Sequence, residues 1–323
     1  MRSRFAPSPT GYLHLGNVWT AMLGWLQTKK AGGILVLRVE DIDEQRSKTE
    51  YMTAFTEDML RLGLTWDEGP DVGGPYGPYI QRERYGRYHE AIERLAGMGL
   101  IYPCYCSRAR LQAVAGAPHD GDMPVYDGRC YGMSEAEREK NNKPPSLRVH
   151  VPDCVISYQD GVYGEQCENL RRDCGDFVVR RLHRDRNLFR VVSGPEGLEP
   201  DGAMGITHVL RGRDLLNSTG RQIALMRLLG YKNRIEYTHV PLLVDSEGRR
   251  LSKRQHGMTV RDLWAAGADS QQILGYLAYK GGLVDTPGRY GLGELVQRFD
   301  TAKIGRTDIF IDAAPADIIK TFI

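Results

Sequence analysis

The pattern of hydrophobic and polar positions near the start of the chain changes from that of a strand to that of a helix. Residues 2–6 predict a short buried strand that leads into a loop rich in proline and glycine at 7–17. Asn17 is expected to cap the helix that follows. Apolar side chains then recur at helical spacing, at Val18, Ala21, Met22, Trp25 and Leu26. Residues 34–39 are almost continuously apolar, which is typical of a parallel strand covered on both faces.

The pattern after this first unit predicts further helices and strands. Two amphipathic helices flank a loop rich in glycine and proline at 69–78. Strands are predicted at 206–210 and 240–244, with a helix over 218–229 between them, and helical segments continue from residue 262. The apolar positions of the two amphipathic helices that flank this loop are Tyr51, Phe55, Met59, Leu62, Tyr85, Tyr88, Ile92 and Leu95.

The order of elements predicts an α/β protein with a Rossmann-like catalytic domain in two halves, and ligands in such folds bind at the carboxyl ends of the strands. This pattern is interrupted by a cysteine-rich stretch and by short predicted strands. The last of these strands, at 176–181, is expected to return toward the core. We interpret residues 103–185 as an insertion. The halves are then 1–102 and 186–245, and residues 246–323 form a basic loop and a helical module.

Composition and charge exclude several classes of protein. The chain has 323 residues and a net charge of +2, so a nucleic-acid partner would have to meet a local basic face. No apolar run reaches the roughly 20 residues of a membrane helix, and the polar N-terminus does not resemble a signal peptide. We expect a cytoplasmic monomer with no membrane partner. In that compartment the six cysteines favour metal binding or free thiols over disulfides.

The loop PSPTGYLHLGN at 7–17 has the residues needed to approach a phosphate group. Its prolines stiffen the backbone, and Gly11 and Gly16 permit close approach of a nucleotide. His14 can donate a hydrogen bond to a phosphate oxygen. The alternative is a structural turn that only leads into the helix.

A second loop, GRRLSKR at 248–254, is glycine-containing and strongly basic. Ser252 and Lys253 lie within it, and a lysine on a mobile loop suits a pyrophosphate leaving group. By itself, a basic turn of this kind is more often a solvated loop.

Three cysteines and one tyrosine form the candidate metal site, namely Cys104, Cys106, Tyr126 and Cys130. Thiolates favour tetrahedral zinc, but the spacing is not that of a zinc finger, and a tyrosinate or another nearby group would have to be the fourth ligand. Reduced structural cysteines remain the alternative. The other cysteines are scattered and predicted to be inert: Cys154, Cys167 and Cys174.

Carboxylates follow the second predicted strand at Glu40, Asp41 and Asp43. They are expected at the same edge of the sheet as the His14 loop. A carboxylate there could bind a substrate ammonium group, while Arg4 or Arg211 binds a carboxylate. The alternative is ion pairing within the cluster.

The two loops, in this order and far apart, resemble the HIGH and KMSKS signatures of class I aminoacyl-tRNA synthetases. Six segments together resemble the glutamyl-tRNA synthetase group of that class, over most of residues 4–284. They are FAPSPTGYLHLGN, LRVEDID, YGPYIQRERYGRY, DFVVRR, GITHVLRGRDLLNSTGRQ and RLSKR.

This resemblance implies a ligase that uses ATP, with Mg²⁺, to activate glutamate as glutamyl-adenylate. It implies catalytic roles for His14 and Lys253. The matching ATP-binding positions are His14, Gly16, Ser252 and Lys253. The matching glutamate-binding positions are Arg4, Ala6, Ser8, Glu40 and Arg211.

Two features resemble the glutamyl-Q tRNA(Asp) synthetases, which are truncated relatives in this group. The chain ends soon after the helical module, so no anticodon-binding domain is expected. The Cys-x-Cys…Tyr-x3-Cys pattern also resembles their zinc site, which implies one structural Zn²⁺ held by Cys104, Cys106, Tyr126 and Cys130. The resemblance implies transfer of glutamate to queuosine at the wobble position, with the anticodon arm of tRNA(Asp) as partner.

One segment departs from the family pattern. The pocket tyrosine expected between DFVVRR and GITHVLRG is missing, with Val191 or Ser193 near its place. Gly194, Pro195 and Pro200 argue against an uninterrupted strand there. This departure leaves two alternatives open: a relative that uses another amino acid or a non-tRNA acceptor, and a catalytically silent RNA- or protein-binding descendant.

Overall fold

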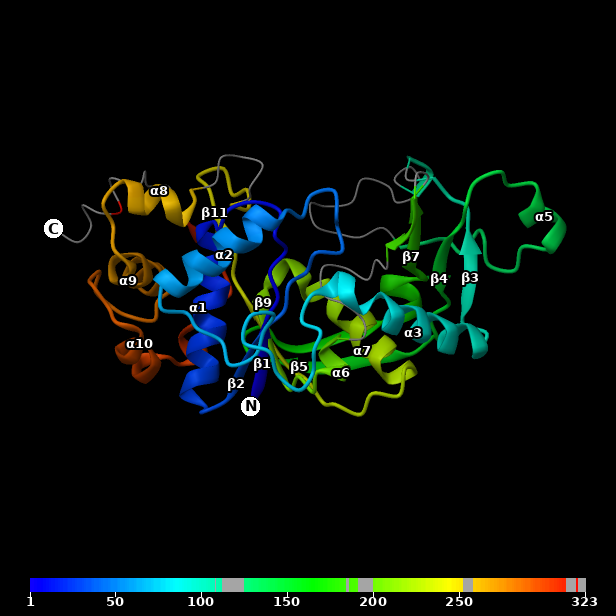
Figure 1. The fold of residues 1–323 in the computed structure, drawn as a ribbon. Coiled ribbons are helices and arrows are strands. Elements are labelled where there is room, and N and C mark those ends of the chain that lie inside the picture. The colour runs from blue at the N-terminus through cyan, green and yellow to red at the C-terminus, as the bar shows by residue number, and fades with distance from the viewer. Residues whose placement is uncertain are drawn as a thin grey trace.

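The molecule is elongated in the computed structural model, with a mainly parallel sheet at its centre (Figure 1). The C-terminal helices lie at one end and a smaller sheet lies at the other. The structure describes residues 1–107, 109–111, 125–183, 186–190, 200–251, 258–311 and 318.

The central sheet has six strands in the order β2-β1-β9-β10-β5-β6, and all neighbours are parallel except β5 and β6. Ser3 on the first strand lies opposite His208, so distant parts of the chain meet in the middle of the sheet. The strands are β1 (Arg2–Phe5), β2 (Ile34–Leu37), β5 (Val155–Asp160), β6 (Gly164–Asn169), β9 (His208–Gly212) and β10 (Glu236–Val240). This arrangement matches the predicted Rossmann-like core.

Eight of the sixteen residues of helix α1 (Leu15–Lys30) are buried, because apolar side chains recur along the helix. Its N-cap is His14, not Asn17 as the sequence predicted. His14 has extended backbone angles, and its imidazole accepts a hydrogen bond from the backbone N–H of Asn17, which lies in the first turn. The imidazole therefore does what the asparagine side chain was expected to do.

Three other predicted helices are present, as α2 (Thr49–Arg61), α3 (Tyr85–Gly97) and α7 (Thr219–Leu228). The single strand predicted at 240–244 is wrong. β10 ends at Val240, and β11 (Leu243–Val244) pairs instead with β12 (Ile309–Phe310). Pro241 separates the two strands, because proline has no N–H to continue a ladder.

The smaller sheet is antiparallel, in the order β3-β4-β7-β8. Its strands are β3 (Ile101–Cys104), β4 (Ser146–Val149), β7 (Phe177–His183) and β8 (Arg186–Arg190), and the short helix α5 (Glu135–Glu139) lies in the β3–β4 connection. The strand expected to return toward the core is β7, which instead lies inside this sheet because it pairs with β4 and β8. Residues 103–185 contribute strands to both sheets, since β5 and β6 join the central one.

The C-terminal module consists of α8 (Val260–Ala265), α9 (Ser270–Lys280) and α10 (Leu292–Arg298). Its apolar side chains share one core with α1. The ribbon shows these helices at the same end of the molecule as α1 (Figure 1). Trp19 of α1 packs so closely that a Cβ at Gly281 would lie 2.1 Å from its ring. The Trp19 indole N–H also donates to the carbonyl of Pro241 at 3.0 Å, which fixes α1 against the end of β10.

The atypical segment is described only at its end. Val191, Ser193, Gly194 and Pro195 lie outside the described residues, and Pro200–Ala203 forms the short helix α6. Among the helices that the structure does describe, none combines the length and apolar character needed to cross a membrane.

Candidate active site

A cleft of about 430 Å³ opens at the carboxyl ends of β1, β9 and β10. Parallel strands of this fold place their ligand sites at this edge. The cleft brings together six residues that the sequence singled out, namely Arg4, Ala6, Ser8, His14, Gly16 and Arg211.

His14 is held in one tautomer by its capping role. Its Nδ1 accepts from the Asn17 N–H at 3.3 Å, so the neutral ring carries its hydrogen on Nε2. The ring is buried at the wall of the cleft. Gly16 approaches closely, because a Cβ there would lie 3.0 Å from the His14 ring.

The segment that follows the basic loop meets the His14 loop. The Leu15 N–H donates to the carbonyl of Met258 at 3.3 Å, and the Val260 N–H donates to the carbonyl of Leu13 at 2.9 Å. On the other side, Leu251 lines the cleft. Ser252 and Lys253 lie outside the described residues.

Arg4 and Arg211 place two buried guanidinium groups at the same cleft. Burial, and after it the positive charge of Arg4, lower the pKa of Arg211 to about 9. Burial also lowers the pKa of Arg4, although Asp201, 3.5 Å from its Nε, acts in the opposite direction. Two like charges held this close in a buried site favour an anionic ligand such as a carboxylate.

Arg211 is fixed by several hydrogen bonds. Its Nε donates to His239 Nε2 at 3.0 Å, and its Nη2 donates to Thr219 Oγ1 and Gln222 Oε1, both at 2.8 Å. Sequence analysis missed His239. It lies within β10 (EYTHV), and no motif in the sequence distinguishes it.

Glu40 is absent from the cleft lining that the described residues form. It is buried, and its Oε1 accepts from Arg38 Nε at 2.7 Å and from Gln81 Nε2 at 3.0 Å. Burial raises the pKa of Glu40, while Arg38 acts in the opposite direction. Arg38 also donates to Asp201 Oδ1 at 2.6 Å, so it lies between two buried carboxylates.

The neighbouring carboxylates pair with arginines. Asp41 accepts from the backbone N–H of Arg82 at 3.0 Å and forms an ion pair with its side chain. Asp43 accepts from Arg46 Nε at 2.6 Å. Asp41 and Asp43 are therefore ion-paired, but with arginines outside the cluster and not within it as the alternative stated.

Two arginines at the cleft were not singled out in the sequence. Arg46 and Arg250 line it, and each is more than half exposed and ion-paired, to Asp43 and Asp214 respectively. A signal was present for Arg250, which belongs to the basic loop motif. These residues add positive charge to the mouth of the cleft.

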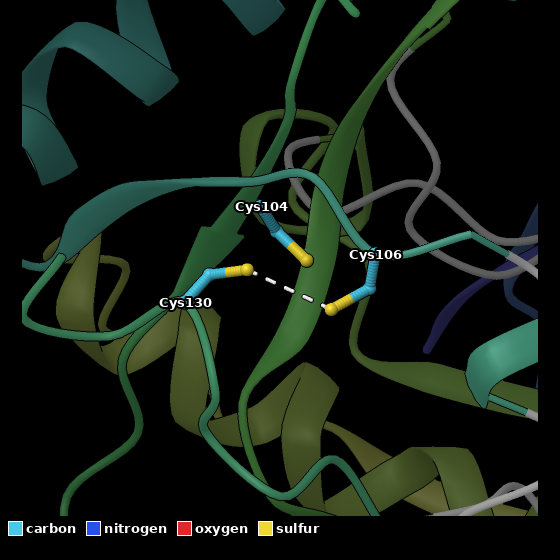
Figure 2. A group of neighbouring side chains, drawn as sticks. All are labelled: Cys104, Cys106 and Cys130. Carbon is cyan, nitrogen blue, oxygen red and sulfur yellow. Dashed lines mark hydrogen bonds between the residues drawn. The ribbon is translucent and has the colours of Figure 1, made fainter. Parts of the chain in front are cut away.

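The sulfur atoms of Cys104, Cys106 and Cys130 lie within 4.8 Å of one another. Figure 2 shows their side chains pointing toward a common centre, with Cys106 and Cys130 Sγ 3.6 Å apart. Burial raises the pKa of Cys106 to about 11, and the neighbouring Cys104 and Cys130 contribute to this rise. A bound cation would offset the repulsion between thiolates held this close.

Tyr126 completes this cluster. Its hydroxyl lies 3.5 Å from Cys104 Sγ and 3.6 Å from Cys106 Sγ, and it accepts from the Cys130 N–H at 2.9 Å. A tetrahedral Zn²⁺ with Zn–S near 2.3 Å and Zn–O near 2.0 Å would separate sulfur atoms by about 3.8 Å and sulfur from oxygen by about 3.5 Å. The four side chains therefore fit a zinc ion. The Arg148 guanidinium lies 3.7 Å from the centre of the Tyr126 ring and adds positive charge beside the cluster.

Comparison with known proteins gives the family. The family model for the catalytic domain of class I tRNA synthetases (E and Q) matches residues 1–284. A protein of Symbiobacterium thermophilum named glutamyl-Q tRNA(Asp) synthetase is 45% identical over 315 residues, covering 96% of this chain and 95% of the relative. A protein of the same name from Nitratidesulfovibrio vulgaris is 44% identical over 290 residues, covering 88% and 87%.

A solved structure agrees with these relatives. The glutamate-tRNA synthetase of Elizabethkingia anophelis matches with a TM-score of 0.80 and 28% sequence identity, covering 98% of this chain and 69% of that one. The predicted fold class and the predicted resemblance are both confirmed. The chain therefore belongs to the family of class I tRNA synthetases of the E and Q group.

Proposed function

We propose that the protein activates glutamate with ATP and transfers the glutamyl group to queuosine in tRNA(Asp). The observation that carries this proposal is the cleft lined by two buried arginines, the His14 loop and the described part of the basic loop. The names of the two relatives that match almost end to end support the choice of amino acid and acceptor.

The amino-acid end of the cleft suits a substrate with two carboxylates and an ammonium group. Arg211, fixed in orientation, binds the side-chain carboxylate, and Arg4 contributes positive charge beside it. Glu40 lies outside the cleft lining formed by the described residues, so its role rests on the family resemblance: its buried carboxylate would provide the negative charge for the ammonium group. Ala6 and Ser8 line the wall between these groups and the His14 loop.

The His14 loop and the basic loop bind ATP. The Nε2–H of His14 donates to a phosphate oxygen, Gly16 permits close approach, and Ser252 and Lys253 bind the leaving pyrophosphate together with Mg²⁺. The α-carboxylate oxygen of glutamate attacks the α-phosphorus of ATP. A C–O–P bond forms, the P–O bond to pyrophosphate breaks, and a hydroxyl of the acceptor nucleoside later displaces AMP to give an ester.

A zinc ion bound by Cys104, Cys106, Tyr126 and Cys130 would be structural. It would join the end of β3 to the loop that holds Cys130, and β3 lies in the smaller sheet, at the opposite end of the molecule from the C-terminal helices (Figure 1). The protein side chains would hold the ion and take no part in the reaction.

The proposal is tested by ATP–pyrophosphate exchange with each amino acid, with and without RNA. We expect exchange with glutamate and without RNA, followed by transfer of labelled glutamate to tRNA(Asp) that contains queuosine and not to the unmodified tRNA. Exchange with a different amino acid would overturn the choice of glutamate. The absence of exchange with every amino acid would support the catalytically silent alternative.

A further inference from the structure

Two buried residues continue the hydrogen-bond chain that begins at Arg211. The side chains of Asp160 and His239 are both fully buried. Asp160 Oδ2 lies 2.7 Å from His239 Nδ1, and His239 Nε2 lies 3.0 Å from Arg211 Nε. The three residues come from β5, β10 and β9, which are neighbours in the central sheet.

The carboxylate determines which ring nitrogen of His239 carries the hydrogen. Asp160 Oδ1 accepts from the backbone N–H groups of Val162 and Tyr163 at 3.0 and 2.9 Å. Its Oδ2 faces His239 and accepts from both the ring Nδ1 and the backbone N–H. A carboxylate only accepts, so Nδ1 carries the hydrogen and Nε2 presents its lone pair to the Nε–H of Arg211.

The electrostatics favour this neutral ring. Burial lowers the pKa of His239, and Arg211 lowers it further, although Asp160 acts in the opposite direction. Burial alone would raise the pKa of Asp160, but the hydrogen bond from His239 and those from the backbone lower it overall. The pair is therefore an ionised aspartate and a neutral histidine.

We propose that Asp160 and His239 are positioning residues for Arg211, whose guanidinium they hold through its Nε–H. Thr219 and Gln222 fix the Nη2 end, so the plane of the guanidinium is set at two points. This orientation resists the repulsion between Arg211 and Arg4 before substrate binds. The proposal rests on the proposed role of Arg211 in binding the substrate carboxylate.

The substitution Asp160→Asn tests this directly. The two backbone donors at Oδ1 require an acceptor, so the amide oxygen takes that place and the NH₂ group faces His239. The ring must then accept at Nδ1 and carry its hydrogen on Nε2, directly against the Nε–H of Arg211. In ATP–pyrophosphate exchange we expect the KM for glutamate to rise roughly tenfold or more, while kcat and the KM for ATP change much less.

A matched control is available in the smaller sheet. Asp176 is also buried, accepts from the backbone N–H of Val151, and lies 3.1 Å from the ring of His150. Asp176→Asn removes a comparable pair without contact with the cleft, and we expect it to leave the KM for glutamate unchanged. An equal rise of the KM for glutamate in both variants would indicate a general loss of structure and would overturn the proposal.

A second measurement does not depend on activity. Long-range ¹H–¹⁵N spectra report which imidazole nitrogen carries the hydrogen, and His239→Gln identifies the signal among the eight histidines. We expect the Nδ1–H form in the native protein and the Nε2–H form in Asp160→Asn. A switched tautomer with an unchanged KM for glutamate would refute the positioning role. If the native protein shows no exchange with glutamate, the proposed function fails, and an Nε2–H form in the native protein would refute the positioning proposal independently.

Discussion

Replacing Arg38 with methionine would remove a cation that bonds two buried carboxylates directly. Arg38 is fully buried, and it donates to Glu40 at 2.7 Å and to Asp201 at 2.6 Å. Methionine approximately keeps the volume of the side chain, so the change isolates the loss of charge and hydrogen bonds. Arg4, 3.5 Å from Asp201, would then be the nearest remaining positive charge.

The expected loss of stability is about 3–5 kcal/mol, because breaking a buried ion pair leaves an uncompensated charge in a low-dielectric environment. That is a large part of the roughly 5–15 kcal/mol of a typical domain. The same substitution at Arg298, which pairs with Glu294 on an exposed helix face, should cost less than about 1 kcal/mol.

The loss should also depend on pH. Burial raises the pKa of Glu40, and removing Arg38 takes away the charge that opposes this rise. A carboxyl with a raised folded pKa binds more protons in the folded state, so stability falls as pH rises from the unfolded pKa toward the folded one. For one such group the deficit should shrink by up to about 1.4 kcal/mol per pH unit as the pH is lowered through that window.

Urea unfolding followed by circular dichroism at pH 8 and pH 5.5 measures both effects. We expect Arg38→Met to be much less stable than the native protein at pH 8 and closer to it at pH 5.5, with Arg298→Met near native at both. A deficit below about 1 kcal/mol at pH 8, or one that is equal at the two pH values, would refute the reasoning.

Two further predictions concern the metal cluster and the basic loop. Cys104→Ser should reduce bound zinc from about one ion per chain and lower the thermal midpoint, whereas Cys167→Ser, at an exposed cysteine, should change neither. Metal analysis and thermal unfolding measure both quantities. A native protein without metal, whose stability does not change in Cys104→Ser, would contradict the zinc proposal. Lys253→Ala should slow adenylate formation by one to a few orders of magnitude while leaving glutamate binding nearly intact; unaltered single-turnover kinetics would exclude its role at the pyrophosphate.

Local patterns predicted most of the fold because they depend on neighbouring residues. The apolar period of α1 and the buried run of β2 were sufficient to predict the first half of the Rossmann-like core. Pairing between distant segments was harder to predict. The assignment of β7 to the smaller sheet and of β5 to the central one depends on which edge each strand meets, and strand composition does not encode this.

The candidate site also combines residues that local patterns predicted with residues whose role depends on distant contacts. Residues in the signature loops, such as His14 and Gly16, could be predicted because glycine, proline and histidine have specific local roles. Asp160 and His239 could not be predicted, since in the sequence each is an ordinary strand residue. Their role depends on the hydrogen-bond chain that they form with Arg211 in the folded protein. Glu40 was predicted as a ligand from its place after β2, but its bond to Arg38 became visible only in the folded chain.

His14 provides a way to separate structure from chemistry at one position. Its Nδ1 caps α1, and its Nε2 is the proposed donor to phosphate. Asparagine is a strong N-cap that does not reproduce a donor at the Nε2 position, so His14→Asn should keep the native stability and lose adenylate formation. Alanine provides neither group, so His14→Ala should lose activity and also about 0.5–2 kcal/mol of stability.

Thermal unfolding and glutamate-dependent exchange, measured on both variants, decide between the two roles. Equal loss of stability in the two variants would mean that the imidazole supports the fold through contacts other than the cap. Retained exchange in His14→Asn would mean that the Nε2 donor is not required. The combination of native stability and lost exchange is expected only if one ring nitrogen begins the helix while the other acts on the nucleotide.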